Sequence, residues 1–151
     1  IMGYLRKSNN KDLDYVIKNM RVIDKIEAFY QSGQSPEDAV AYSYLCSNIT
    51  MTVAGDNDQP MGLCGVAANK CIWFVATDEL YATKKYRIQL IRKGKEWVDS
   101  LLKTHDYLYN YVYKENTNAI KWLRSMNFNF INLHKEFGYQ KQPFYEFMRI
   151  V

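Results

Sequence analysis

Residues 107–130 read YLYNYVYKENTNAIKWLRSMNFNF, and this stretch decides the fold. Tyrosine occupies every second position of its first seven residues, and a period of two with aromatic side chains is typical of a β-strand. Apolar residues then recur at helical spacing from Ala119 to Met126, and Asn116 stands where a helix N-cap is favoured. The pattern therefore predicts a strand followed closely by a short amphipathic helix.

The end of this helix is marked by Asn127. Asparagine is one of the few residues other than glycine that accept the left-handed backbone conformation common after helices. Phe128, Phe130 and Ile131 then start a second extended run. We therefore expect a strand–helix–strand unit in which Asn127 has a positive φ.

The rest of the chain predicts further strands and helices around this unit. The expected strands are Gly3–Lys7, Ile49–Ala54, Met61–Ala67, Cys71–Thr77 and a segment within Leu133–Val151 that has Gly138 at its turn. The expected helices begin near Asn10, at Asp24 with a capping-box partner in Glu27 and an end at Gly33, at Ser35 before a proline, and at Thr83. The strand Cys71–Thr77 is apolar at nearly every position, which predicts a central strand covered on both faces.

Length and composition place the chain among globular proteins. With 151 residues, of which 48% are hydrophobic, we expect one folded domain spanning 1–151 with a sizeable core. No apolar run is long enough to span a membrane, and the N-terminus lacks a signal-peptide apolar region. Cys46, Cys64 and Cys71 lack CxxC spacing and lie in apolar runs, which predicts reduced core thiols of an intracellular protein. Two well-separated histidines predict no metal site.

The predicted helix Thr83–Thr104 is the most basic segment. Gly94 lies on its apolar stripe, where a missing side chain would allow close approach to the sheet. Its cations have two interpretations: a solvated helix face, or a phosphate site in which Lys84, Lys85 and Arg87 add charge to the N–H groups of the helix start. A net charge of +4 spread over one domain argues only weakly for nucleic-acid binding, which we do not expect.

The strand–helix–strand unit resembles the C-terminal half of the acyl-CoA N-acyltransferase fold of the GNAT superfamily. In that family the helix after the fifth strand carries Asn, two residues, Ala, an aromatic–Tyr pair and a closing Gly-Phe. The matching positions here are Asn116, Ala119, Trp122-Leu123 in place of the aromatic–Tyr pair, Asn127 in place of the glycine, and Phe128. The runs QPMGLCGV and CIWFVATDEL, together with residues 107–128, are similar to GNAT-like proteins of short-tailed phages, which are described as acetyltransferases or as internal virion proteins. The resemblance covers residues 35–151.

The resemblance implies an α/β fold with a mixed central sheet, splayed fourth and fifth strands, and helices on both faces. The fourth and fifth strands are then Cys71–Thr77 and Tyr107–Tyr113, parallel neighbours joined by the basic helix. They would diverge toward their C-terminal ends and leave a V-shaped opening beside Thr77 and Tyr113.

The resemblance also implies acetyl-CoA as a co-substrate. Amides of the fourth strand near Val75 and Thr77 would hold the acyl-pantetheine arm, and the start of the basic helix would bind the pyrophosphate. The implied cofactor-binding residues are Val75, Thr77, Lys84, Lys85, Arg87 and Asn116. Thr83–Gln89 lacks the glycines with which the family's loop brings backbone amides to the pyrophosphate, so we expect weak acetyl-CoA binding.

Candidate catalytic residues lie on the fifth strand or close after one of these two strands. Asp78 and Glu79 follow the fourth strand and could accept a proton from an amine, or they could merely end the strand. Leu123 stands where many family members place a tyrosine that protonates the departing thiolate, and leucine has no proton to donate. Tyr109, Tyr111 or Tyr113 on the fifth strand could substitute, with Tyr111 as the chosen candidate, although a tyrosine ladder on a strand also serves packing.

Two functions remain open at this point. One is acyl-CoA-dependent N-acetyl transfer to an amine on a small molecule or protein, in the cytoplasm of a phage-infected host. The other is a non-catalytic virion or assembly protein that keeps the fold as a scaffold and contacts other virion proteins. An open cleft lined by ordered polar groups would favour the enzyme, and a filled cleft would favour the scaffold. No membrane partner is expected.

Overall fold

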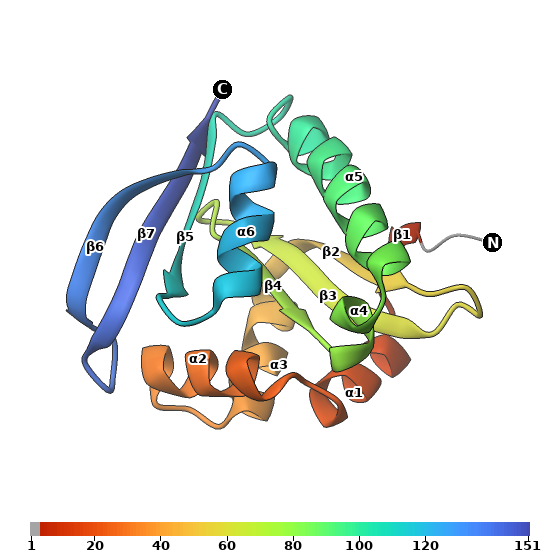
Figure 1. Cartoon of the computed structure of the whole chain (residues 1–151), viewed down its shortest axis with the longest axis horizontal. Coiled ribbons are helices and arrows are strands. Elements are labelled where there is room, and N and C mark those ends of the chain that lie inside the picture. Colours follow the sequence, from red (N-terminus) through yellow and green to blue (C-terminus); the bar gives the residue numbers. More distant parts are fainter. Residues whose placement is uncertain (1–3) are drawn as a thin grey trace.

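Two antiparallel sheets that diverge from a common point frame the protein, and helices cover them (Figure 1). The computed structural model describes residues 4–151, so Gly3, the expected start of the first strand, lies outside the described residues. The elements in chain order are β1 (Tyr4–Lys7), α1 (Asn10–Lys18), α2 (Val22–Ser32), α3 (Pro36–Cys46), β2 (Ser47–Ala54), β3 (Pro60–Ala67), β4 (Ile72–Ala76), α4 (Asp78–Ala82), α5 (Lys84–Leu101), β5 (Tyr107–Tyr113), α6 (Thr117–Ser125), β6 (Asn129–Phe137) and β7 (Gln142–Ile150). This order is the α/β arrangement expected from the sequence.

The two sheets have simple antiparallel topologies. The first has the strand order β1-β2-β3-β4 and the second β5-β7-β6, with every neighbouring pair antiparallel. β5 is the alternating tyrosine run Tyr107–Tyr113, with the bounds that its period of two predicts. Gly138 in the turn between β6 and β7 has φ 75°, a conformation that glycine adopts without steric cost.

β4 and β5 are parallel, as expected, but they pair at a single point. An isolated bridge joins Cys71 to Tyr109. Beyond it the Asn110 side chain donates to the Ile72 carbonyl oxygen at 2.6 Å and accepts from the Tyr111 N–H at 2.7 Å. Because Asn110 occupies these backbone groups, the ladder between β4 and β5 stops and the strands diverge. The expected splay is confirmed, and it divides the mixed sheet into two.

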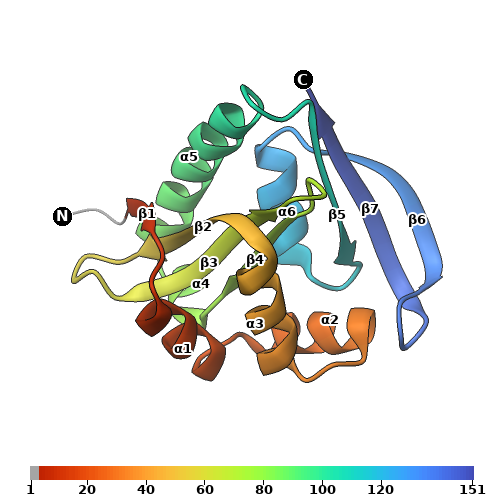
Figure 2. The same ribbon diagram turned by 180° about the vertical axis from the view of Figure 1, so that it is seen from behind.

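Helices cover both faces of the first sheet, as expected. Successive residues of a strand point to opposite faces, so neighbours on β3 enter different clusters. Leu63 packs with Val16, Met20 and Val40 under α1 and α3, whereas Cys64 faces the larger cluster under α5 and α6. Figures 1 and 2 show α1 and α3 apart from α5, across the sheet. α3 and α5 therefore lie on opposite faces of the same sheet.

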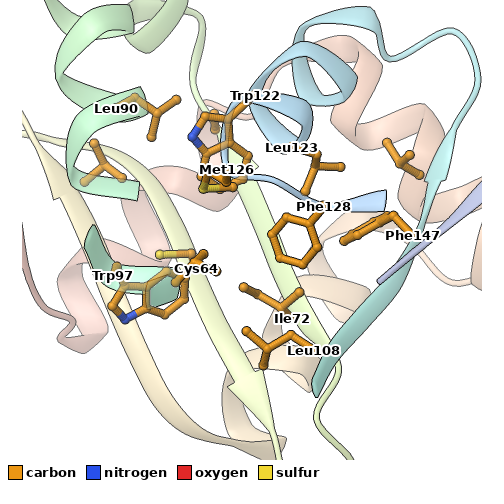
Figure 3. Close-up of a cluster of buried hydrophobic side chains, with 14 of the residues drawn as sticks. Cys64, Ile72, Leu90, Trp97, Leu108, Trp122, Leu123, Met126, Phe128 and Phe147 are labelled. Carbon is orange, nitrogen blue, oxygen red and sulfur yellow. The ribbon is translucent and has the colours of Figure 1, made fainter. Parts of the chain in front are cut away.

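The larger core cluster joins α5 and α6 to both sheets (Figure 3). Trp122 of α6 packs against Phe74 of β4, with ring centroids 4.5 Å apart. A Cβ atom on Gly94 would lie 3.0 Å from both Met126 Sδ and Trp122 Nε1. The missing side chain therefore allows α5 to approach α6, whereas the sequence predicted a close approach to the sheet.

The helix ends largely follow the local sequence signals. The Ser35 hydroxyl caps α3, and α2 ends at Gly33 with φ 73°. Asn127 follows α6 with φ 66°, which confirms the predicted left-handed conformation. α1 is capped by Asn9 instead of Asn10, because Asn9 forms a capping box with the third residue that follows it.

Two expectations, about the place of β4 in its sheet and about Cys46, are wrong. β4 is covered on both faces, with Phe74 against the larger cluster and Trp73 and Val75 against the smaller one, but these side chains are half-buried because β4 is an edge strand and not a central one. Cys46 is exposed, while Cys64 is buried as a core thiol should be. Cys46 is the last residue of α3 and borders the open cavity described below instead of the core.

Candidate functional site

A cavity of about 570 Å³ lies in the gap between the diverging strands β4 and β5. Its walls come from α2, α3, β4, β5 and α6, and they are mostly apolar. Phe74 and Val75 line the β4 side, and Tyr111 and Val112 line the β5 side. Cavities of this size are typical of small-molecule sites. The V-shaped opening expected between these strands is therefore present.

Helix α2 borders this cavity with two carboxylates, one at the end of each diverging strand. Asp24 Oδ2 accepts the Ala76 N–H at 2.9 Å, at the end of β4. Glu27 Oε2 accepts the Tyr113 N–H at 2.9 Å, at the end of β5. The spacing of three residues places both carboxylates on one face of α2. We call Asp24 and Glu27 the carboxylate clamp, because each one holds a different sheet.

Asn116 connects the two members of the clamp. Its Nδ2 donates to Asp24 Oδ1 and to Glu27 Oε2, both at 3.2 Å. Asn116 occupies the predicted N-cap position of α6, yet its side chain makes no capping hydrogen bond. It is only 1% exposed, and its Oδ1 has no hydrogen-bond partner among residues 4–151. The asparagine therefore serves the clamp and not the helix start.

Burial raises the pKa of both clamp carboxyls. The pKa of Asp24 rises to about 6, because the loss of water outweighs the favourable charge of Arg21, whose Nη1 lies 3.5 Å away. The pKa of Glu27 rises to about 7, through burial and then through repulsion by Asp24. Arg21 also stacks over the Tyr81 ring at 4.2 Å, and burial raises the pKa of that phenol. Burial thus shifts the pKa of both clamp carboxyls toward neutral pH.

The amides expected to hold an acyl-pantetheine arm are not free in the gap. The Thr77 N–H donates to the Met61 carbonyl oxygen of β3 at 2.9 Å. Val75 pairs with Leu63 in the same ladder, and residues two apart on a strand direct their N–H groups to the same neighbour. Ala76 and Phe74 direct their N–H groups to the opposite side, into the gap, and Asp24 occupies the one at Ala76.

The three cations predicted to bind phosphate do not converge on one point. Lys85 forms an ion pair with Asp56 on the β2–β3 turn, and Arg87 Nη1 donates to the Tyr81 carbonyl oxygen at 2.7 Å. Lys84 is exposed, and none of the three lines the cavity. The Thr83 hydroxyl accepts the Tyr86 N–H at 3.4 Å, so the chain itself caps the start of α5.

The predicted catalytic residues are also dispersed. Asp78 is exposed and begins the short helix α4, which the sequence did not predict. Glu79 Oε1 accepts from Gln59 Nε2 at 2.9 Å, away from the cavity lining. Tyr111 does line the cavity, and its ring stacks on Phe137 with centroids 4.3 Å apart. Leu123 lines the cavity as well.

The clamp is the feature that sequence reasoning missed. The spacing Asp24-x-x-Glu27 predicts a capping box, but α2 begins two residues before Asp24 and Arg21 occupies its N-cap position. That prediction is wrong. The same spacing also indicates two side chains on one helix face, which is the signal that could have identified the clamp.

Within residues 4–151, no group of three or more His, Cys, Asp or Glu side chains is arranged to hold a metal ion. No helix in that range is both long and apolar enough to cross a membrane.

Solved acetyltransferases share this fold. A spermidine N-acetyltransferase from Vibrio cholerae in complex with CoA and spermine is similar with a TM-score of 0.70 at 14% identity, covering 99% of this chain and 95% of that one. A GNAT-family acetyltransferase from Bacillus anthracis gives 0.67 at 13% identity over 99% and 95% of the two chains. A ribosomal-protein-S5-alanine acetyltransferase from Vibrio fischeri gives 0.65 at 11% identity over 99% and 93%. The protein is therefore a GNAT-fold protein.

Sequence comparison assigns the chain to a family. Residues 49–138 match the family described as Bacteriophage T7, probable scaffold protein Gp13, and the chain belongs to that family. The probable scaffold protein gp13 of Escherichia phage T7 is 30% identical over 83 residues, which are 52% of this chain and 54% of the relative. The chain thus spans about half the length of the curated relative it matches. The phage branch of the GNAT fold expected from the sequence is confirmed.

Proposed function

We propose that the protein is a non-catalytic phage assembly or internal virion protein that uses the GNAT fold as a scaffold. One observation carries this proposal: Asp24 Oδ2 accepts the Ala76 N–H, which faces the gap at the end of β4. An acyl-pantetheine arm that reaches the end of β4 would place a carbonyl group against that amide. A side chain of the protein already fills this role.

The clamp would have to open before such an arm could bind. A hydrogen bond from a backbone amide to a charged carboxylate contributes roughly 1.5–3 kcal/mol. Displaced from Ala76, Asp24 would also remain buried beside Glu27 with one hydrogen bond fewer, which adds to the cost. Acetyl-CoA binding would therefore require α2 to leave its preferred conformation.

The start of α5 supports the same proposal. It has no glycine that would let backbone amides approach a pyrophosphate, and two of its three cations are engaged by Asp56 and by the Tyr81 carbonyl. Leu123 lines the cavity at the position of the expected acid and has no proton to give. The scaffold description of the family supports a place among virion proteins, in the virion or in the infected host cell.

Acyl-CoA-dependent N-acetyl transfer is the second candidate, and one observation favours it. The cavity is open and is bordered by Glu27, whose pKa of about 7 suits a general base at neutral pH. Glu27 would accept a proton from an ammonium group entering the gap, and Tyr111 would be the donor to the thiolate. The acceptor would be an amine, the class that the spermidine N-acetyltransferase neighbour acts on.

Calorimetric titration with acetyl-CoA tests both candidates. We expect no binding to the wild-type protein at millimolar ligand, and no release of free thiol with spermidine or a lysine peptide as acceptor. Micromolar affinity that is lost in the Lys84→Ala/Lys85→Ala double variant would overturn the proposal and identify an enzyme.

A matched pair of clamp variants tests the reason for weak binding. Asp24→Ala frees the Ala76 amide, whereas Glu27→Gln leaves it occupied. We expect Asp24→Ala alone to gain acetyl-CoA affinity, with circular dichroism confirming that both variants are folded. Equal affinity of a folded Asp24→Ala variant and Glu27→Gln would show that Asp24 does not exclude the ligand.

A further inference from the structure

The outer face of α5 combines two exposed isoleucines with cations. Ile88 and Ile91 are each 43% exposed, and Arg92 and Lys95 lie beside them on the same side of the helix. Neither cation forms an ion pair with any carboxylate of residues 4–151. We call Ile88, Ile91, Arg92 and Lys95 the basic face of α5.

The charges of this face are not neutralised by the acids further along the helix. Glu96 pairs with Lys93 at 3.5 Å, and Asp99 pairs with Arg149 of β7 at 2.8 Å. Both nearby acids thus already have partners within the same molecule. The basic face is left with apolar area and positive charge, which suits a surface that offers apolar area and negative charge.

The protein itself carries such a surface on α3. Tyr42 and Leu45 are 64% and 80% exposed, and Asp38 lies one turn before Tyr42 on the same side of the helix. Asp38 forms no ion pair with a cation of residues 4–151. We call Asp38, Tyr42 and Leu45 the acidic face of α3.

The two faces match in spacing when the helices run antiparallel. From Asp38 the steps to Tyr42 and Leu45 are four and three residues. From Lys95 the steps back to Ile91 and Ile88 are also four and three. At a rise of about 1.5 Å per residue, the register brings Lys95 to Asp38, Ile91 to Tyr42 and Ile88 to Leu45. Charge meets opposite charge at one end, and apolar side chains meet at the other.

We propose that the basic face of α5 docks on the acidic face of α3 of a second copy of this chain. α3 and α5 lie on opposite faces of one sheet, so the two surfaces cannot meet within a single copy (Figures 1 and 2). Each copy therefore uses a different surface toward each of two neighbours. A head-to-tail contact of this kind builds rings when it closes and filaments when it does not.

Other occupants fit the two faces less well. A twofold contact between two basic faces would set cations against cations, which is unfavourable. A nucleic acid would engage Arg92 and Lys95 but would leave Ile88 and Ile91 without an apolar partner. The inference goes beyond the proposed function, because it concerns assembly and not ligand binding, although Tyr42 also lines the cavity. An active enzyme could assemble in the same way.

Sedimentation velocity over a concentration series tests the contact. We expect wild-type protein to form concentration-dependent assemblies larger than a dimer. Leu45→Glu and Ile91→Glu each break one face at an exposed position, so each variant should be monomeric while remaining folded. An equimolar mixture of the two retains one intact pair of faces and should form dimers only. A wild-type protein that stays monomeric, or a dimer insensitive to both changes, would overturn the proposal.

Charge exchange tests the register. Asp38→Lys and Lys95→Glu should each abolish assembly. The double variant should restore it, because the two charges have then exchanged places and opposite charges again meet at the same point of the contact. Association of the wild type should also weaken with salt. Failure of the double variant to assemble would overturn the antiparallel register. None of these changes touches the gap, so the acetyl-CoA titration remains an independent test of the proposed function.

Discussion

The start of α5 and the mouth of the gap are the two places where this fold offers polar groups to a ligand, and they differ in almost every respect. At the start of α5, cations are exposed and bond to partners on the surface. At the mouth of the gap, Asp24 is 5% exposed and shares Asn116 with Glu27, and both carboxylates hold backbone amides. The first region looks like a binding site in sequence, and the second one holds the ends of β4 and β5 through buried hydrogen bonds.

The difference shows that charge density is a poor guide to which polar groups matter. Exposed ion pairs are screened by water and contribute little to stability. Buried polar groups cannot replace a lost hydrogen bond with one to water, so the loss of each such bond destabilises the fold. We therefore expect substitutions at the clamp to have large effects and substitutions at the start of α5 to have small ones.

The largest effect is expected for Asn116→Ala. This change removes both hydrogen bonds from Nδ2 to the clamp and should lower the free energy of unfolding by about 3 kcal/mol at pH 8. Urea denaturation measures it. Asn132→Ala is the matched control, because Asn132 is exposed and reaches Glu146 at 3.4 Å, and it should change little. Equal costs for the two variants would contradict the distinction between the regions.

A smaller effect is expected from the protonation of Glu27. Its pKa in the folded state, about 7, lies above the ordinary value, so the stabilisation from its protonated form is complete below the ordinary pKa and is lost as pH rises through about 7. Relative to wild type, Glu27→Gln should gain on the order of 1–3 kcal/mol of unfolding free energy between pH 5 and pH 8. The unfolding free energies of wild type and Glu27→Gln, measured by urea denaturation, should differ more as the pH rises. Parallel profiles would show that Glu27 titrates normally.

Asn127 gives a test of about 1 kcal/mol that concerns backbone conformation alone. The residue is exposed and has φ 66°. Asn127→Gly should be neutral or slightly stabilising, whereas Asn127→Val should cost about 1 kcal/mol or more, because a β-branched residue is strained there. Thermal unfolding of both variants provides the comparison. Identical midpoints would be inconsistent with a left-handed helix end.

The smallest effect is expected at the start of α5. Lys85→Ala removes the exposed ion pair with Asp56 and should leave the unfolding midpoint in urea unchanged within error. A loss as large as that of Asn116→Ala would mean that the surface pair is as important as the clamp, and the contrast between the two regions would be lost.

What could be predicted from sequence follows from how far apart the interacting residues lie. β5, the cap at Ser35 and the helix end at Asn127 depend on neighbours within a few residues, so local patterns identify them. The partners of the clamp lie far away: Asp24 and Ala76 are 52 residues apart, and Glu27 and Tyr113 are 86. No local pattern shows which distant amide a carboxylate will meet.

Residue type alone also did not predict where the side chains of the expected catalytic residues lie. Glu79 is engaged by Gln59 and Asp78 is exposed, and neither lines the cavity, because α4 begins directly after β4. Tyr111 lines the cavity, as its neighbours Asn110 and Val112 also do, and its catalytic role stays a prediction. The fold could therefore be predicted further than the site.

The carboxylate clamp also has a consequence for motion. The amides of Ala76 and Tyr113 belong to different sheets, yet both are protected from solvent exchange by side chains of one helix and not by a neighbouring strand. Local detachment of α2 would release both at once while leaving the interiors of the sheets protected. In native-state hydrogen exchange these two amides should thus show the same opening free energy, below that of the core strands. Their shared exchange would report how often the gap opens, on a timescale far slower than side-chain motion.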